Sequence, residues 1–199
     1  MRQSDLSSIN TAIKIATGID YKGIHKNNLG SGGSGASTFI IRDDKSNIEF
    51  FVKTSDLSGF NMLHMEYEGI KEIFQTNTIK VPKPICYGTS DYTSFVVFEK
   101  LSLGGIGDPK VAAIKLADMH RCVSKNNLYG WDFNNTIGAT LQINNWNKNW
   151  ADFWDKERLG FMIEVKTILT LFVKFYYFNF FYYISYVKQR ELIFQRKKL

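Results

Sequence analysis

The sequence predicts an α+β fold, in which an antiparallel sheet packed on a helix forms a small lobe and the first helices of a helical large lobe follow. Three observations predict this fold. Short runs rich in β-branched and aromatic residues, of which 48–54 is the clearest, are separated by turn residues. Longer stretches at 57–75 and 109–122 carry apolar residues at helical spacing. The glycine pair at 104–105 is a natural break between the two lobes.

The central strand is predicted at residues 48–54, directly after a run of turn-forming Asp, Ser and Asn residues. Successive side chains of a strand point to opposite faces, so Phe50 and Val52 share one face. Phe51 and Lys53 share the other. A lysine on a half-buried face needs a counter-charge or an anionic ligand.

Two neighbouring features favour an anionic ligand. The glycine-rich run 30–35 lies upstream of the strand, and the predicted helix 57–75 downstream carries Glu66. A glycine-rich hairpin, a strand lysine and a helix glutamate, in this order, form the first half of a kinase-type nucleotide site. The glycines alone leave a phosphate loop and a plain flexible turn equally open. A dinucleotide site is not favoured, because strand-like residues 37–42 follow where that site needs a helix.

The chain begins with a predicted amphipathic helix at 4–16, which Ser4 or Asp5 would cap and Gly18 would end. We assign it no chemistry and expect it to pack on the sheet. A first strand at 22–29 has only a weak pattern.

A hairpin closes the small lobe. Pro82 and Pro84 keep the residues before them extended, and the runs 85–88 and 93–101 are the two predicted strands. Backbone groups at the end of the second strand would meet the edge of an adenine ring, whereas an ordinary buried strand running into a loop fits the same pattern. The hinge candidates are Glu99, Lys100 and Leu101.

The second lobe is predicted to start at Asp108, which caps a helix running to about residue 122. The segments 130–138 and 142–150 are rich in amide and indole side chains. These side chains suit polyol recognition, but a well-bonded loop that rests on a core is the interpretation we rank first. A further helix is predicted at 151–164.

Composition limits the partners. The chain has 199 residues and a net charge of +6, but residues 1–164 are neutral and the whole excess lies in 165–199. The neutral folded part does not predict a nucleic-acid partner. Two cysteines form no disulfide framework and no targeting pattern is seen, which favours a reducing compartment and a cytoplasmic location.

Several short segments stand in a characteristic order: Phe50-Phe51-Val52-Lys53, Thr78-Ile79-Lys80-Val81-Pro82, Leu116-Ala117-Asp118-Met119-His120, Asn135-Thr136-Ile137-Gly138, Gln142-Ile143-Asn144-Asn145-Trp146 and Arg158-Leu159-Gly160. Through them, residues 5–164 resemble the fructosamine-3-kinase family, also called ketosamine-3-kinase or protein-ribulosamine 3-kinase. The resemblance implies a protein-kinase-like fold. It also implies phosphorylation of the sugar 3-hydroxyl of fructosamine or ribulosamine adducts on protein lysines by ATP with Mg²⁺, which serves protein deglycation because the phosphorylated adduct is unstable.

The resemblance also implies roles for individual residues. Asn144 and Trp146 fall in a family motif of the second lobe and are expected to be structural. Two glycines belong to the phosphate loop, a lysine grips the phosphates, a helix glutamate pairs with that lysine, and two hinge residues lie near adenine. These cofactor-binding residues are Gly32, Gly33, Lys53, Glu66, Glu99 and Leu101.

The chain departs from the family after residue 160. The family's His-Gly-Asp-Leu-Trp-x-Gly-Asn loop, which carries the catalytic aspartate and a metal-binding asparagine, does not occur in these 199 residues. No catalytic or metal-binding residue is therefore assigned, and this polypeptide is expected to be inactive or nearly so. The alternative is a non-catalytic, pseudokinase-like fragment that binds nucleotide or a partner, with or without a membrane tether.

These inferences divide the chain into a small lobe with its hinge (1–101), a partial large lobe (102–164) and an aromatic, basic tail (165–199). The apolar faces of the predicted helices 109–122 and 151–164 are expected to be uncovered. Half of residues 168–187 are Phe or Tyr. Translated non-coding sequence, a membrane span and a genuine packed element remain open for this tail.

Overall fold

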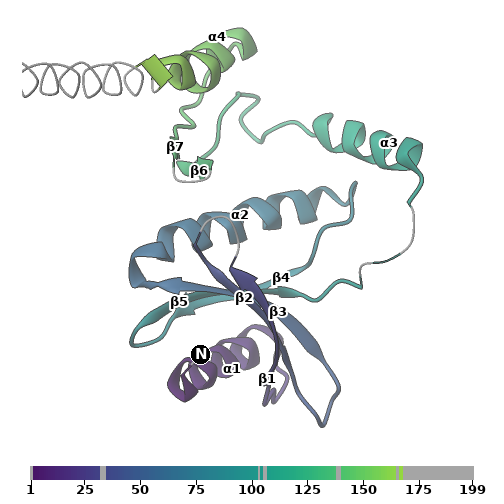
Figure 1. Cartoon of the computed structure of the whole chain (residues 1–199). Coiled ribbons are helices and arrows are strands. Elements are labelled where there is room, and N and C mark those ends of the chain that lie inside the picture. Colours follow the sequence, from purple (N-terminus) through teal and green to yellow (C-terminus); the bar gives the residue numbers. More distant parts are fainter. Residues whose placement is uncertain are drawn as a thin grey trace, which may run out of the picture.

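The computed structural model describes residues 2–31, 35–102, 104, 107–137, 140–164 and 166–167. It confirms the α+β fold. A five-stranded antiparallel sheet, in the order β1-β2-β3-β5-β4, forms the small lobe (Figure 1). Its strands are β1 (Ile24–Ser31), β2 (Ser37–Arg42), β3 (Glu49–Asp56), β4 (Pro84–Thr89) and β5 (Thr93–Glu99).

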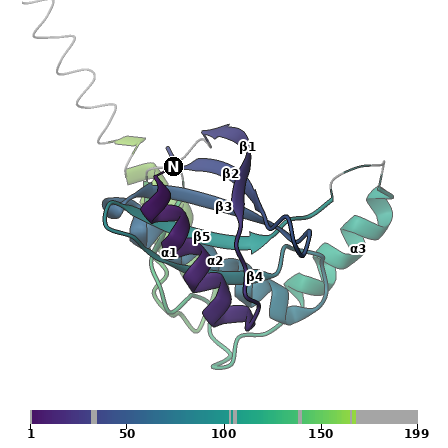
Figure 2. The same cartoon turned by 90° about the horizontal axis from the view of Figure 1, so that it is seen from below.

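Two helices cover the two faces of this sheet (Figures 1 and 2). Helix α1 (Gln3–Thr17) packs on one face, where its buried Ile9 and Ile13 join the core. Helix α2 (Phe60–Thr76) packs on the other through Leu63. The sheet is therefore the middle layer of three, and every core strand must present apolar side chains in both directions.

Strand β3 follows the predicted alternation. Phe50 and Val52 are buried in the core on the side of α1, whereas Phe51 packs on the side of α2. Lys53 shares the face of Phe51. Strand β3 lies between β2 and β5, and the residues directly opposite Lys53 are Thr38 of β2 and Val96 of β5. The lysine thus extends from the centre of the sheet toward α2.

The predicted N-cap of α1 was wrong. The helix begins at Gln3 with Arg2 as its cap residue, and Asp5 lies in the first turn, where it accepts a hydrogen bond from the Arg2 backbone N–H at 3.1 Å. Asp5 is instead recruited to tertiary packing, as described below. The predicted end is confirmed, because Gly18 adopts the left-handed conformation (φ 73°) that favours glycine.

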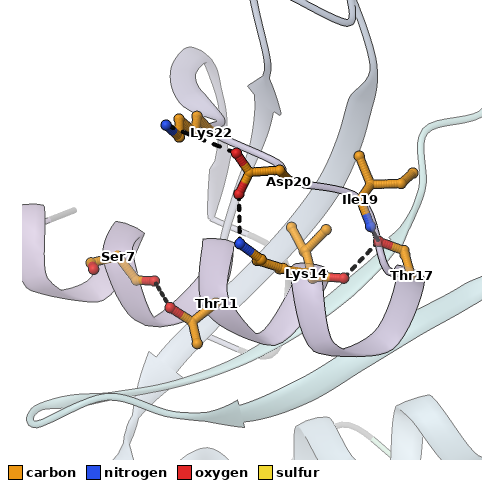
Figure 3. Close-up of polar contacts among 8 residues, drawn as sticks. Ser7, Thr11, Lys14, Thr17, Ile19, Asp20 and Lys22 are labelled. Atoms are coloured by element: carbon orange, nitrogen blue, oxygen red, sulfur yellow. Dashed lines mark hydrogen bonds and ion pairs between the residues drawn. The ribbon is translucent and has the colours of Figure 1, made fainter.

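Surface polar contacts tie the segment after α1 back to the helix (Figure 3). Asp20 accepts a hydrogen bond from Lys14 Nζ at 2.7 Å, and Lys22 lies 3.9 Å from the same carboxylate. The hydroxyl of Thr17 accepts from the Ile19 backbone N–H at 3.2 Å. Because these charges are exposed, we expect them to orient the chain more than to stabilise it.

Asp5 is buried, with 1% of its surface exposed, and joins α1 to the β4–β5 turn. Ser90 and Thr93 donate hydrogen bonds to its Oδ1 at 2.5 and 3.0 Å. Burial alone would raise the pKa of Asp5, but hydrogen bonds from Ser90, the Arg2 backbone and Thr93 outweigh burial and lower it. The folded state therefore favours the carboxylate, and this contribution to stability is fully present above the unfolded-state pKa and is lost as the pH falls through the lower folded-state pKa.

We expect Asp5→Asn to lower the free energy of unfolding at pH 7 by about 1 kcal/mol and to flatten the loss of stability between about pH 5 and pH 3. Urea unfolding followed by tryptophan fluorescence across this pH range measures both effects. Asp91→Asn, an exposed site in the same turn, is the matched control and should change neither. An unchanged pH dependence in Asp5→Asn would show that Asp5 is not the titrating group.

The second-lobe elements lie on the α2 side of the sheet (Figure 1). Asp108 caps helix α3 as predicted, since its carboxylate accepts from the Lys110 backbone N–H at 2.8 Å. A small hairpin and a short helical segment follow. These elements are α3 (Pro109–His120), β6 (Asn135–Ile137), β7 (Thr140–Gln142), α4 (Trp150–Trp154) and η2 (Asp155–Gly160).

The single helix predicted at 151–164 is interrupted. Residues Asp155–Gly160 form a wider π-helical turn before α-helical geometry resumes. Glycine permits this turn, because a Cβ at position 160 would lie 2.3 Å from the Asp155 carbonyl oxygen.

The expected uncovered apolar faces are confirmed. Helix α3 buries none of its side chains, and Ile114 is 61% exposed. In the second segment, Trp150 and Leu159 are each about half exposed. None of the helices described is long and apolar enough to cross a membrane. The aromatic stretch 168–187 lies outside the described residues.

Candidate functional site

The predicted lysine and glutamate meet. Lys53 Nζ donates hydrogen bonds to both carboxylate oxygens of Glu66, at 2.8 and 2.6 Å. The side chains are 17% and 33% exposed, so the pair is partly shielded from water and still reachable. Such shielding makes charge-assisted hydrogen bonds stronger than they are on an open surface.

Local structure after β3 brings the glutamate over the lysine. Asp56 ends the strand, and its carboxylate accepts from the Gly59 backbone N–H at 3.1 Å, which closes the 3₁₀ turn Leu57–Gly59. Helix α2 starts immediately afterwards and is anchored by Leu63, which is 1% exposed. Glu66 follows one turn later on the side of the sheet that Lys53 faces.

A groove of about 700 Å³ is lined by residues of β1, β2 and β3 and of the segment that follows β5, and most of its lining is apolar. One of its lining residues, Phe51, shares its strand face with Lys53, but neither Lys53 nor Glu66 lines the groove. The groove is lined by Leu29, Ile40, Phe51, Pro82, Glu99, Lys100, Leu101 and Ser102.

The two predicted hinge residues differ in what they can offer. The Glu99 backbone N–H donates to the Lys83 carbonyl at 2.8 Å, and its carboxylate accepts from the Lys83 N–H at 3.0 Å. Glu99 therefore joins β5 to the segment before β4. Within the described residues, the Leu101 backbone N–H and carbonyl form no hydrogen bond, so they are available to a ligand in the groove.

The glycine-rich turn is described only at its ends. Gly30 and Gly35 have φ values of 95° and 78°, a conformation that suits glycine. Strand β2 follows them, as the kinase-type arrangement requires. Gly32 and Gly33 lie outside the described residues, so their predicted contact with phosphate stays a prediction.

A second cavity, of about 620 Å³, is lined by both Lys53 and Glu66. It lies between α2 and the β6–β7 hairpin, and sequence reasoning did not single out its polar residues as site residues. The amide- and indole-rich composition of 130–150 was the only signal. The residues from this region that line the cavity are Trp131, Asn135, Thr136, Gln142 and Asn144, and Arg158 from the later helical segment lines it too.

Asn144 holds this region together, in agreement with its expected structural role. It is 3% exposed, and its Nδ2 donates to the Phe133 carbonyl at 2.8 Å and to Asn135 Oδ1 at 2.9 Å. Its Oδ1 accepts from Arg158, and its backbone N–H donates to Asn134 Oδ1 at 3.0 Å. Trp146 is likewise anchored, by a hydrogen bond from Nε1 to Asp132 at 3.0 Å.

The side chains that could bind a metal ion are dispersed. In the part of the chain that the structure describes, no group of three or more His, Cys, Asp or Glu side chains is arranged to hold a metal ion. Both cysteines are free thiols. The ring of His64 stacks on Tyr87 at 4.2 Å, which is a packing role.

Comparisons with known proteins agree with the geometry. The model of the family described as fructosamine kinase matches residues 6–170. The chloroplastic protein-ribulosamine 3-kinase of Oryza sativa subsp. indica is 40% identical over 120 residues, 59% of this chain and 35% of that protein. The corresponding Arabidopsis thaliana protein is 32% identical over 139 residues, 69% of this chain and 43% of its own length.

The structural comparison extends the match to the fold. A crystal structure from Haemophilus somnus 129PT, classed with the fructosamine-3-kinases, superposes with a TM-score of 0.72 at 27% identity. The superposition covers 82% of this chain and 55% of that one. The chain thus spans about half or less of the length of the relatives it matches.

Proposed function

Because the chain belongs to the fructosamine kinase family, we propose that it carries the nucleotide-binding part of a site for ATP-dependent phosphorylation of ketosamines. The acceptor is the sugar 3-hydroxyl of a fructosamine or ribulosamine adduct on a protein lysine. The observation that carries this proposal is the Lys53–Glu66 ion pair, with contacts of 2.6 and 2.8 Å, on the strand face that also presents Phe51 to the apolar groove.

The described residues fit a nucleotide. A purine ring suits the groove, because Ile40 and Phe51 offer apolar faces and the backbone of Leu101 offers one donor and one acceptor. The phosphates would extend along β3 toward Lys53. Glu66 fixes the ammonium group, so Lys53 can donate to phosphate oxygens without first being ordered.

The fit does not extend to Mg²⁺. No cluster of carboxylates that could hold a metal is found among the described residues, and the 199 residues contain no His-Gly-Asp-Leu-Trp-x-Gly-Asn loop. Lys53 and Glu66 bind and orient ATP, and nothing we have assigned in this polypeptide activates the sugar hydroxyl.

The expected result for the 199-residue polypeptide is ATP binding without turnover. ATP should raise the midpoint of thermal unfolding equally with and without Mg²⁺, because the lysine rather than a metal holds the phosphates. A ribulosamine adduct of a blocked lysine should yield no 3-phosphate above background. Turnover comparable to that of a full-length relative would contradict the missing-base argument, and absence of any ATP effect would contradict the nucleotide site.

A further inference from the structure

A single hydrogen bond ties the second lobe to helix α2. Trp131 Nε1 donates to Glu72 Oε1 at 2.6 Å, and among the described residues no other hydrogen bond joins residues 2–102 to residues 107–167. An indole N–H that donates to a carboxylate forms a charge-assisted bond, which is stronger than a bond between neutral groups. Because Glu72 is exposed, we expect this bond to fix the position of α2 more than to stabilise the fold.

Two aromatic rings accompany the bond. The Trp131 indole lies against Gly69, where an added Cβ would be 3.9 Å from the ring. Phe133 packs edge-on against Trp131 with ring centroids 5.3 Å apart, and its ring lies 6.1 Å from that of His64 on α2. The second lobe therefore contacts α2 at points spread along most of the helix.

These contacts lie across the helix from its anchor in the sheet. Leu63, which is 1% exposed, fixes α2 on the sheet side. Glu72 follows about two and a half turns later, which places it on the opposite side of the helix. Helix α2 is thus held between the sheet on one side and Trp131 on the other.

The donor side of the contact is fixed within the second lobe. The Asn144 carbonyl accepts from the Trp131 backbone N–H at 2.9 Å, and Asn144 Nδ2 donates to the Phe133 carbonyl at 2.8 Å. Asn144 is 3% exposed, so water does not readily replace these bonds. Residues 131–133 therefore move with the second lobe, and α2 follows them through Glu72.

We propose that Trp131 and Glu72 form a clasp that sets the Lys53–Glu66 contact and that both are positioning residues. Glu66 lies between the two anchors of α2, one turn after Leu63. Both of its oxygens contact Lys53 Nζ, at 2.8 and 2.6 Å, and such a geometry is lost when a side chain moves by more than about 0.5 Å. Release of Glu72 lets α2 rotate about Leu63 and weakens the ion pair. Resting on the proposed function, the clasp also strengthens the grip of Lys53 on ATP.

The test measures the energetic coupling between Lys53 and Glu66, from urea unfolding of Lys53→Met, Glu66→Gln and the double variant, followed by circular dichroism. In the otherwise unsubstituted chain, the pair should contribute about tenfold to the folding equilibrium constant beyond the separate effects of the two residues. In Trp131→Phe, which keeps a ring but removes the donor, this coupling should fall to about threefold or less. Glu72→Met should have the same effect, whereas Glu72→Gln keeps an acceptor oxygen and should restore most of the coupling.

Trp146→Phe is the matched control. Trp146 Nε1 donates to Asp132 at 3.0 Å, within the second lobe rather than to α2. The coupling should therefore stay unchanged within about twofold in this variant. A general loss of stability affects the single and double variants alike and cancels from the coupling, so a merely structural role of Trp131 would leave the coupling unchanged.

No coupling in the unsubstituted chain, or the same coupling in Trp131→Phe and Glu72→Met as in that chain, would overturn the inference. ATP affinity, measured by calorimetry in the same variants, separates the two proposals. ATP binding with a coupling that ignores Trp131→Phe and Glu72→Met refutes the clasp alone. A coupling that falls in both variants, in a protein that does not bind ATP, supports the clasp and refutes the nucleotide site.

Discussion

Lys53→Ala is expected to reduce the affinity for ATP by about 10- to 100-fold, the cost of losing a hydrogen bond to a charged group. Lys53 Nζ is the cation on the strand face that carries Phe51 of the apolar groove, and Glu66 fixes its position at 2.6 Å. The variant leaves Glu66 unpaired, and the like charges of the carboxylate and the phosphates then repel each other. Titration of ATP by calorimetry measures the change directly.

Lys71→Ala is the matched control for the loss of one positive charge. Lys71 lies on α2 and pairs with Glu68 at 3.0 Å, but it is 41% exposed and lines neither of the two cavities. Its removal should leave the ATP affinity unchanged within about twofold. If Lys53→Ala and Lys71→Ala weakened binding equally, the effect would be one of net charge, and the assignment of Lys53 to the phosphates would fail.

Asn144→Ala is expected to destabilise the protein by about 3 kcal/mol. The substitution removes the partners of the Phe133 carbonyl, Asn135 and Arg158 together. All of these groups lie near a side chain that is 3% exposed, so water cannot readily replace the lost hydrogen bonds. Urea unfolding followed by the fluorescence of Trp131 and Trp146, which flank this site in sequence, is the appropriate measurement.

Asn126→Ala provides the comparison for Asn144→Ala. Asn126 is exposed and makes one local hydrogen bond, from the Leu128 backbone N–H at 3.0 Å, so its loss should cost less than about 1 kcal/mol. Similar costs for the two substitutions would show that Asn144 is not the centre of the network.

Much of the small lobe could be predicted because its determinants are local. Side chains alternate along β3, which places Phe50 and Lys53 on opposite faces of the sheet. The interval between Lys53 and Glu66 has room for the single turn Leu57–Gly59 before α2 begins. The cap of α1 could not be predicted in the same way. Asp5 has the chemistry of a cap, but Ser90 and Thr93, some 85 residues away, make it a tertiary contact.

The second lobe shows the same division. The helix start at Asp108 follows from local chemistry and was correct. The π-helical turn at Asp155–Gly160 was not predicted. The spacing of apolar residues cannot distinguish an α-helical turn from a π-helical turn, whose hydrogen bonds span one residue more. The backbone N–H of Glu99 is occupied by its hydrogen bond to Lys83, which leaves the backbone of Leu101 as the hinge position available to a ligand. The sequence of the strand does not reveal the pairing of Glu99 with Lys83.

The sequence by itself determined the order of strands and helices in the small lobe and placed a cation and an acid on the same side of its sheet, because side-chain periodicity and chain direction act over a few residues. Only the tertiary structure decided that Trp131 contacts α2 and that Thr136 and Gln142 line a cavity together with α2 and the ion pair. Such a cavity is the space left between segments about seventy residues apart, and its shape depends on how closely those segments pack rather than on the pattern within either one.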